Sequence, residues 1–339
     1  MKQVWVTKKG GPHVLQVREV AEPQPGAGEI RVQVKAAGVN FADNLIRMGL
    51  YPGAPKPPMV PGFEVAGIVD KLGSGARGFR EGDRVMAILP TLGGYSEKVV
   101  LPAALAASVP RHLSDEQAGA VPVIYATAWM MLVRLANVQP GEMVLIHSAG
   151  GGVGLAAVQI AKWRGARIIG SASTHKHARL KEMGCEHCID YHSQDVELET
   201  IRLTGGHGAD VILDPNGGRS FARSYRSLAA MGRLVIYGVS SFAPGKTMSP
   251  IAALKGVLGM PRFKPLDMLG QNKSVLAFWL GRPGLDPNKV RAELGQALKL
   301  IEQKVLDPIV DRAFRFEQAA EAHHYMQDHR NFGKLVLTP

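Results

Sequence analysis

The chain has 339 residues, of which 46% are hydrophobic and 20% are charged. These proportions are ordinary for a globular protein and exclude an intrinsically disordered one, and the length favours two lobes or one large domain. The formal net charge of +11 attracts anionic ligands, but the basic residues are scattered along the chain, so we expect no specific nucleic-acid binding.

The cysteine content and the apolar segments indicate where in the cell the protein is expected to be found. Two cysteines, Cys185 and Cys188, are too few for a disulfide framework. The first residues, MKQVWVTKKGG, lack the long apolar stretch of a secretory signal. The most apolar segment, residues 119–133, contains Pro122 and is shorter than the ~20 apolar residues that a spanning helix needs. We therefore expect a soluble, cytoplasmic protein.

The first 123 residues predict a β-rich lobe that is interrupted by glycine and proline turns. Residues 29–40 alternate between apolar and polar side chains, as a half-buried strand does. Residues 63–73 and 82–88 predict further short strands between turn residues.

From residue 124 the pattern changes to strands that alternate with helices. The sequence predicts helices over 154–163 and 178–183, and strands over 143–146, 167–172, 188–191, 211–214, 234–237 and 275–280. Such alternation is typical of parallel strands joined by crossover helices. This lobe is therefore predicted to be α/β, with a doubly wound parallel sheet.

The last part of the chain returns to the first pattern. Residues 288–306 and 316–328 predict helices, and residues 333–339 predict a final strand. We expect this part to complete the first lobe. The predicted domains are 1–123 together with 283–339, and an inserted domain over 124–282.

A glycine-rich turn follows the first strand of the inserted domain. Its six residues, Ala149, Gly150, Gly151, Gly152, Val153 and Gly154, fit the spacing of a dinucleotide-binding turn with alanine in the first glycine slot. Gly151 would let the backbone approach a pyrophosphate, which the amide groups and dipole of the following helix would hold. The alternative is a tight strand-to-helix turn without a ligand.

The second strand of this domain leads into a polar and basic segment. An NAD site usually has an acidic residue there, but residues 173–179 read STHKHAR, and the first acidic residue is Glu182. Hydroxyl and cationic groups favour a 2′-phosphate, so the sequence predicts NADP, bound by Ser173, Thr174, Lys176 and His177, with Tyr191 as a neighbour. The alternative is a solvated polar helix start.

Several segments occur in an order that resembles the medium-chain dehydrogenase/reductase superfamily. They are GVNFADNLIRMGLYPG (38–53), PGFEVAGIV (61–69), GDRV (82–85), YATAWMML (125–132), SAGGGVG (148–154) and GKLVL (333–337). They look most like its zinc-free quinone oxidoreductase branch, that of zeta-crystallin. ADVILDPNGG (209–218) and residues 261–280 resemble the vesicle amine transport protein subgroup more closely still.

This resemblance implies a fold, a cofactor and an assembly. It implies a GroES-like catalytic domain, a Rossmann domain, an active cleft between them, an NADPH requirement and a homodimer. In similar enzymes Thr127 matches a residue that contacts the nicotinamide half. We further assign Tyr237, Gly238 and Lys334 to the cofactor-binding set.

Two departures from the zinc alcohol dehydrogenases of the superfamily concern the metal. Asn40 and Phe63 stand where those enzymes have a cysteine and a histidine ligand, and the cysteine-rich structural zinc lobe is absent. Neither side chain can serve as the expected ligand, and the single pair Cys185 and Cys188 cannot fill a tetrahedral site. We expect no metal, and we expect this pair to be packing residues.

Without a Lewis acid, reduction of a conjugated acceptor is the favoured chemistry. Asn40, Asp43 and Tyr51 lie in the segment that borders the nicotinamide in similar enzymes. We expect Asn40 to donate to the acceptor carbonyl and Tyr51 to line the pocket or supply a proton. Asp43 is either catalytic or a turn residue, and Leu45 stands where many relatives have tyrosine.

The predicted function is an NADPH-dependent reductase of quinones or related α,β-unsaturated carbonyl compounds, with a small-molecule substrate that the sequence does not name. One alternative is an enoyl thioester reductase. Another is a nucleotide-binding protein at a membrane surface, because residues 254–273 mix basic and apolar side chains. For this segment we favour a lid or a dimer contact. We expect His323 and His324 to lie on the surface, and His147 to be a packing residue.

Overall fold

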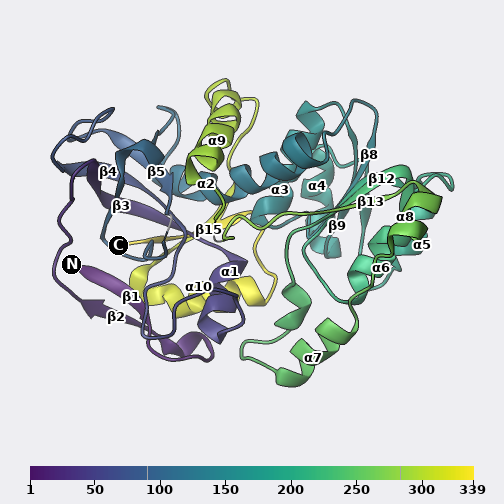
Figure 1. Ribbon diagram of the computed structural model, residues 1–339, viewed down its shortest axis with the longest axis horizontal. Coiled ribbons are helices and arrows are strands. Elements are labelled where there is room, and N and C mark those ends of the chain that lie inside the picture. The colour runs from purple at the N-terminus through teal and green to yellow at the C-terminus, as the bar shows by residue number, and fades with distance from the viewer. Residues whose placement is uncertain (90, 283) are drawn as a thin grey trace. The chain divides into compact units, whose positions relative to one another are not determined.

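The computed structural model describes residues 1–89, 91–282 and 284–339 (Figure 1). It forms two compact units. Unit 1 consists of Met1–Ala126, Gly245–Met248 and Arg282–Pro339, and unit 2 consists of Thr127–Pro244 and Ser249–Gly281. Residue 283, where we place the return to the first lobe, lies outside the described residues. Residues 245–248 also belong to unit 1, which no sequence pattern predicts.

Unit 1 is built on a seven-stranded, mainly antiparallel sheet with the order β14-β15-β3-β4-β5-β7; β6 also pairs with β3, and β1 pairs separately with β2. Its strands are β1 (Lys2–Val6), β2 (Leu15–Glu19), β3 (Glu29–Val39), β4 (Glu64–Leu72), β5 (Arg84–Ile88), β6 (Lys98–Pro102), β7 (Ala107–Ser108), β14 (Val310–Arg315) and β15 (Lys334–Thr338). Its helices are α1 (Phe41–Met48), most of α2 (Asp115–Trp129), α9 (Pro287–Glu302) and α10 (Ala319–Gln327). The C-terminal strand β15 runs antiparallel to β3, with Leu335 opposite Val39.

Strand β3 is less exposed than its alternating sequence predicts. Residues Ala36–Val39 are all buried, because α2 covers this end of the strand. A Cβ atom on Gly119 of α2 would lie 2.7 Å from the Cβ atom of Ala36, so the glycine allows helix and strand to touch. The strand therefore delivers Asn40, the next residue, into a buried position.

Helix α2 is a buried core helix. With the π-helical turn Met130–Leu135 it spans 21 residues, 115–135, and among the described residues it alone is long and apolar enough to cross a membrane. However, 78% of its most apolar window is buried inside the fold, as in the core helices of soluble proteins. Pro122 interrupts its hydrogen bonding, and the amide of Val123 donates instead to Glu64 Oε2 at 2.7 Å.

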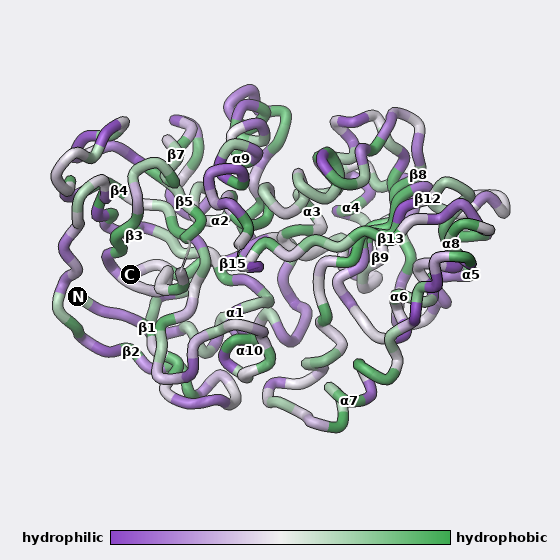
Figure 2. The backbone as a smooth tube through the Cα atoms, in the orientation of Figure 1, coloured by the Kyte–Doolittle hydropathy of each residue, from purple (hydrophilic) through white to green (hydrophobic). Residues whose placement is uncertain are grey.

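Unit 2 is a parallel six-stranded sheet with the order β10-β9-β8-β11-β12-β13. The strands are β8 (Met143–His147), β9 (Arg167–Ser171), β10 (His187–Ile189), β11 (Ala209–Asp214), β12 (Leu228–Ile236) and β13 (Ser274–Ala277). The helices are α3 (Gly152–Trp163), α4 (His177–Met183), α5 (Val196–Leu203), α6 (Arg219–Arg226), α7 (Pro250–Leu258) and α8 (Pro265–Gln271). Figure 2 shows the apolar character of the central strands, which are buried on both faces.

The strand order confirms the predicted fold class, a GroES-like domain and a Rossmann domain. In unit 2 the order reverses between β8 and β11, which is the switch point where sheets of this kind bind ligands beyond the carboxyl ends of their strands. The glycine turn leaves β8 at this edge.

Candidate active site

The turn after β8 brings α3 close to the strand. Ser148 adopts a left-handed conformation with φ 54°, Ala149 is fully buried, and α3 begins at Gly152. A Cβ atom on Gly154 would lie 2.3 Å from the carbonyl oxygen of Ser148 and 2.6 Å from that of Ala149. Only glycine fits there, so Gly154 is required for the packing of the turn itself.

Gly151 is a glycine for a different reason. Its backbone is extended, with φ −84° and ψ 171°, a conformation that any residue adopts. A Cβ atom there would meet a single atom within 4 Å, the carbonyl oxygen of Ser148 at 3.3 Å. The position is therefore open, and it adjoins the first amide groups of α3, which have no partner within the helix. This clearance fits a phosphate group that approaches the backbone.

The loops after β9 and β10 meet through side-chain hydrogen bonds. The hydroxyl oxygen of Ser173 lies 3.1 Å from the hydroxyl oxygen of Tyr191 and 3.3 Å from Nε2 of His192. The ring of Tyr191 is 40% exposed and packs against the ring of His192, with 4.3 Å between their centroids. The structure thus brings the predicted residues Ser173 and Tyr191 together and adds His192, which the sequence analysis missed.

A carboxylate that sequence reasoning overlooked lies in the same loops. Thr174 Oγ1 donates to Asp190 Oδ2 at 2.7 Å, and Asp190 also accepts from the His192 amide and the Ser193 hydroxyl. These hydrogen bonds, led by that of Thr174, lower the pKa of Asp190. Asp190 follows the third strand rather than the second, so a search about 20 residues after the glycine turn does not find it.

The other residues assigned to the cofactor are placed as follows. Lys176 is largely buried, and the ring of His177 lies 2.8 Å from the carbonyl oxygen of Ala172. Thr127 is buried in α2. Tyr237 follows β12, and burial followed by the charge of Asp214 raises its pKa above the usual range. A Cβ atom on the adjacent Gly238 would lie 2.8 Å from the carbonyl oxygen of Pro215.

In unit 1, Asn40 is held between two opposite charges. Its Nδ2 donates to Glu64 Oε1 at 2.9 Å, and its Oδ1 accepts from the Lys334 ammonium. Lys334 Nζ lies 2.7 Å from Glu64 Oε1, and the two side chains are 3% and 0% exposed. The remaining hydrogen of Asn40 Nδ2 has the Gly38 carbonyl oxygen at 3.5 Å, a distance at the limit of a hydrogen bond.

This arrangement bears on the metal question. The Lys334 ammonium already neutralises Glu64 at the place where zinc enzymes hold a cation, and Asn40 is committed to both groups. A divalent ion there would meet a fixed positive charge, so the residues present do not fit a zinc ion. Among the described residues no group of three or more His, Cys, Asp or Glu side chains is arranged to hold a metal.

Asp43 organises the loop around Asn40. Its carboxylate accepts from the Asn40 amide at 2.8 Å, the Gly62 amide at 3.2 Å and the Tyr95 hydroxyl at 3.0 Å. Complete burial raises the pKa of Asp43 to about 6, although these bonds and Lys334 oppose the shift. Because Asp43 accepts these hydrogen bonds from the protein's own loops, the geometry of the described residues favours the turn role over a catalytic one.

The hydrogen bonds continue from Asp43 into α10. The Tyr95 hydroxyl lies 3.4 Å from His323 Nε2, and Arg47 Nε donates to His323 Nδ1 at 3.3 Å. His323 is therefore fully buried, and the expectation of a surface histidine is wrong. The helix carries it inward beside Ala322 and Ala319 rather than outward. Burial and the Arg47 charge lower the pKa of His323 to about 3.

Tyr51 lies beside Phe63, after the end of α1. It is half-buried, and its ring lies 5.7 Å from that of Phe63, the residue that replaces the histidine of zinc enzymes. Phe63 thus contributes an apolar wall instead of a metal ligand. Leu45 is buried in α1. The site predictions for Tyr51, Thr127 and Lys334 as catalytic or cofactor contacts stay predictions.

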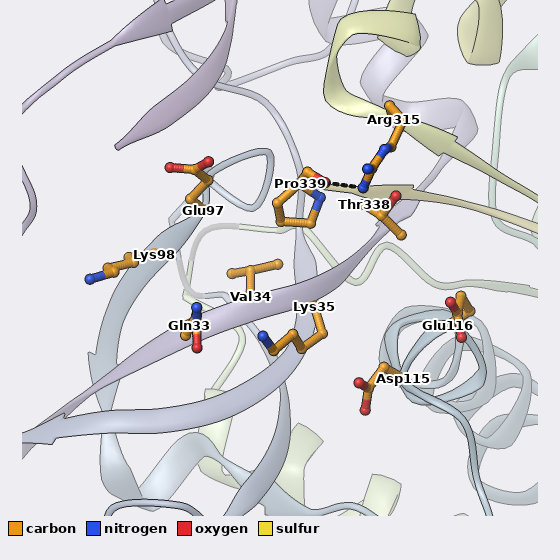
Figure 3. A pocket seen from close by; sticks show the side chains of 10 residues that line it. All are labelled: Gln33, Val34, Lys35, Glu97, Lys98, Asp115, Glu116, Arg315, Thr338 and Pro339. Atoms are coloured by element: carbon orange, nitrogen blue, oxygen red, sulfur yellow. Dashed lines mark hydrogen bonds between the residues drawn. The ribbon is translucent and has the colours of Figure 1, made fainter.

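A separate cavity of about 520 Å³ lies in unit 1 and contains none of these residues (Figure 3). It is lined by Gln33, Val34, Lys35, Glu97, Lys98, Asp115, Glu116, Arg315, Thr338 and Pro339. Three of its charged side chains are engaged by the protein itself: Lys98 pairs with Glu22 and Asp70, Asp115 pairs with Arg84, and Arg315 donates to the carbonyl oxygen of Pro339. We assign it no role in the reaction.

Two family models match the sequence. An alcohol dehydrogenase GroES-like domain matches residues 26–111, and a zinc-binding dehydrogenase domain matches residues 183–337. The zinc in the second description refers to the family, because Asn40 and Phe63 replace two of its ligands in this chain.

Full-length relatives agree with these models. The chain is 37% identical over 326 residues to the human synaptic vesicle membrane protein VAT-1 homolog, covering 96% of this chain and 82% of that protein. It is 33% identical over 344 residues to a 2-haloacrylate reductase from a Burkholderia species, covering 98% of each. The Escherichia coli quinone oxidoreductase complexed with NADPH matches the fold with a TM-score of 0.85 and 32% identity over all of both chains. The chain therefore belongs to the medium-chain dehydrogenase/reductase superfamily, in the zinc-free quinone oxidoreductase-like branch near the VAT-1 homologs.

Proposed function

We propose that the protein is a zinc-independent, NADPH-dependent reductase of quinones or related α,β-unsaturated carbonyl compounds. The observation that carries the proposal is the buried ion pair of Lys334 and Glu64 with Asn40 between them, which stands where zinc enzymes hold their metal. Direct alcohol oxidation lacks its Lewis acid in such a site, whereas a conjugated acceptor is already electrophilic. The relatives that reduce 2-haloacrylate and quinones support this class of acceptor.

The residues present fit NADPH. When bound, the cofactor supplies the hydride. Gly151 leaves room at the first amides of α3 for the pyrophosphate, and Ser173, Tyr191 and Lys176 gather hydroxyl and cationic groups beyond β9 and β10. The NADPH complex of the E. coli quinone oxidoreductase supports the same choice.

Asn40 is the proposed donor to the acceptor carbonyl. Its second Nδ2 hydrogen is only weakly engaged by the Gly38 carbonyl, while Glu64 and Lys334 fix the amide in one orientation. A donor held in this way needs no reorganisation when negative charge develops on the acceptor oxygen. Tyr51 or solvent would then supply the proton.

Cofactor choice is tested by titration of the protein with NADPH and NADH. We expect NADPH to bind about ten- to a hundredfold more tightly, which is the usual worth of a charge-assisted phosphate contact. Ser173→Ala should weaken NADPH binding and leave NADH binding unchanged. His175→Ala, an exposed change in the same loop, is the matched control and should alter neither. Equal or tighter binding of NADH would contradict the proposal.

An enoyl thioester reductase is the nearest alternative, because a carbon–carbon double bond next to a carbonyl is the shared feature of both acceptor classes. Assay of enoyl thioesters beside quinones and simple enones separates them. A preference of more than tenfold in kcat/KM for the thioester would favour the alternative.

A membrane-surface role has one observation in its favour. Helices α7 and α8 expose apolar side chains, among them Leu254, Leu258, Leu266 and Leu269, and the same helices or their flanks carry the exposed Lys255 and Lys264. Co-sedimentation with anionic vesicles at several salt concentrations tests this role. Absence of salt-sensitive binding would remove it and leave the lid or dimer contact.

The proposal also includes a cytoplasmic homodimer. Strand β13 forms one edge of the sheet of unit 2, and open edges readily pair with another strand. Light scattering on the purified protein should give twice the mass of one chain.

A further inference from the structure

The chain's two cysteines lie next to each other at the start of β10. Cys185 is buried, and its sulfur lies 3.1 Å from where a Cβ atom of Gly170 in β9 would stand. Cys188 is half-buried and pairs in register with the same Gly170. Its sulfur lies 3.7 Å from the carbonyl oxygen of His177. Both cysteines therefore lie against the same residue of β9, Gly170.

The two thiols differ in reactivity. The neighbouring Cys188 and burial raise the pKa of the Cys185 thiol. The neighbouring Cys185 and the charge of Lys181 lower the pKa of the Cys188 thiol, although burial opposes this shift. Cys188 is also the less buried of the two, so it is the thiol that an oxidant reaches, and Cys185 is the one that would resolve its oxidised product.

The cysteine pair is connected to both loops of the predicted nucleotide site, through the chain that follows Cys188 and through its contact with His177. Asp190 and Tyr191 follow Cys188 within three residues, and Tyr191 bonds Ser173. The Cys188 sulfur contacts the carbonyl oxygen of His177. The ring Nε2 of His177 in turn lies within hydrogen-bond distance of the carbonyl oxygen of Ala172, just after β9. A displacement of Cys188 is thus transmitted to the ends of both β9 and β10.

We propose that Cys185 and Cys188 form a reversible disulfide on reaction with a hydroperoxide, and that this disulfide weakens nucleotide binding at the loops after β9 and β10. The second half rests on the proposed function. To bond at about 2.05 Å, the sulfur of Cys188 must leave the carbonyl of His177 and move toward Cys185. The contact between β10 and the start of α4 is then lost.

The chemistry balances in two steps. The Cys188 thiolate attacks the terminal oxygen of the hydroperoxide, so that a sulfur–oxygen bond forms and the oxygen–oxygen bond breaks. The other oxygen leaves as hydroxide from hydrogen peroxide, or as alkoxide from an organic hydroperoxide, and is protonated to water or an alcohol. The Cys185 thiol then loses its proton and attacks the Cys188 sulfur. The sulfur–sulfur bond forms, and the oxygen leaves as water. The two sulfurs together lose two electrons, which the peroxide gains.

Disulfide formation is tested without any nucleotide. Hydrogen peroxide should remove both titratable thiols of the unfolded chain, lower its mass by about 2 Da, and be reversed by dithiothreitol. Cys185→Ser should instead stop at an oxygen adduct on Cys188. Retention of the thiols, or irreversible oxygen adducts on the two cysteines of the wild type, located by peptide mass analysis, would overturn the first half of the proposal.

Nucleotide binding is then measured on the reduced and oxidised protein with NADP⁺, which does not donate a hydride. Oxidation should raise the Kd about tenfold, and Cys188→Ser treated with peroxide should keep its reduced-state Kd. By linkage, saturating NADP⁺ should raise the reduction potential of the pair by about 30 mV, the equivalent of tenfold. A disulfide that forms and leaves both quantities unchanged would overturn the second half.

If the proposed function is wrong, the same experiments give a result that differs from failure of the disulfide proposal. In that case the reduced protein binds no NADP⁺, while thiol loss and recovery still report on the disulfide. Amide hydrogen exchange over residues 171–192 would then show whether oxidation loosens the two loops. Unchanged exchange in the oxidised protein would overturn the proposal.

Discussion

At the scale of single residues, the site of unit 1 depends on polar groups that pair far from their places in the sequence. The resemblance to the family pointed to Asn40, Asp43 and Lys334 as site residues. It did not point to Tyr95 and His323, which complete the hydrogen-bond network. Tyr95 lies 52 residues after Asp43, and His323 lies 228 residues after Tyr95. No local spacing rule connects such positions, because the sheet and α10 bring them together.

The proposed roles of Asn40 and Tyr51 can be distinguished by the effects of their substitutions on kcat. Asn40→Ala should lower kcat by about a hundred- to a thousandfold, the usual worth of a donor at a developing oxyanion, without changing NADPH affinity. Tyr51→Phe should lower kcat strongly if Tyr51 supplies the proton and only slightly if it lines the pocket. The measurement is steady-state kinetics with the best acceptor, alongside NADPH titration. Wild-type rates in both variants would show that the catalytic assignment is wrong.

Asp43 and His323 should give the free energy of unfolding opposite pH dependences. Burial raises the pKa of Asp43 from 3.8 to about 6 and lowers that of His323 from 6.5 to about 3. Between about pH 4 and pH 6, folding takes up a proton at Asp43 and releases one at His323. Rising pH therefore weakens the contribution of Asp43 and strengthens that of His323, each by up to about 1.4 kcal/mol per pH unit.

When either group is replaced, the pH dependence that the other group contributes to the free energy of unfolding should become measurable. Relative to wild type, the stability of Asp43→Asn should increase as pH rises from about 4 to 6, and that of His323→Gln should decrease. Urea unfolding at several pH values measures both differences, which should level off near pH 7. Parallel profiles for wild type and both variants would contradict these assignments.

At the scale of elements, periodicity predicted the strands and helices of unit 2 well, because buried parallel strands and crossover helices have strong local signals. The third strand was placed at 188–191 and is found at His187–Ile189, so Asp190 and Tyr191 lie in a loop. That one shift hid the contact of Asp190 with Thr174. The sequence pattern also does not predict what packs against the exposed apolar faces of α7 and α8, because amphipathicity shows that a helix has an apolar face and not what covers it.

The glycine turn offers a matched pair of variants. Gly151→Val should abolish nucleotide binding and lower the Tm much less than Gly154→Val, because its Cβ atom would meet only the carbonyl oxygen of Ser148, at 3.3 Å, a close contact that a small shift relieves. Gly154→Val should destabilise the fold by at least about 1–3 kcal/mol, since its Cβ atom would lie 2.3 Å from backbone. Thermal unfolding and NADPH titration separate the two. If Gly151→Val binds NADPH normally, the phosphates lie elsewhere.

At the scale of the whole molecule, the chain contains the proposed nucleotide-binding unit and a unit with the buried ion pair of Lys334 and Glu64. The net charge of +11 suits an anionic cofactor and anionic acceptors, though it selects neither by itself. Which acceptor enters depends on loops whose conformation no sequence pattern determines. The central claim is therefore about reaction class: hydride passes from NADPH to a conjugated acceptor without a metal.

The most direct measurement is the rate of NADPH and NADH oxidation with a panel of quinones and enones, after dialysis of the protein against a chelator. The account predicts oxidation that depends on the acceptor, matches acceptor reduction mole for mole, is unchanged by the chelator, and has kcat/KM at least about tenfold higher for NADPH than for NADH. Absence of acceptor-dependent NADPH oxidation, or activity that the chelator removes and zinc restores, would contradict it.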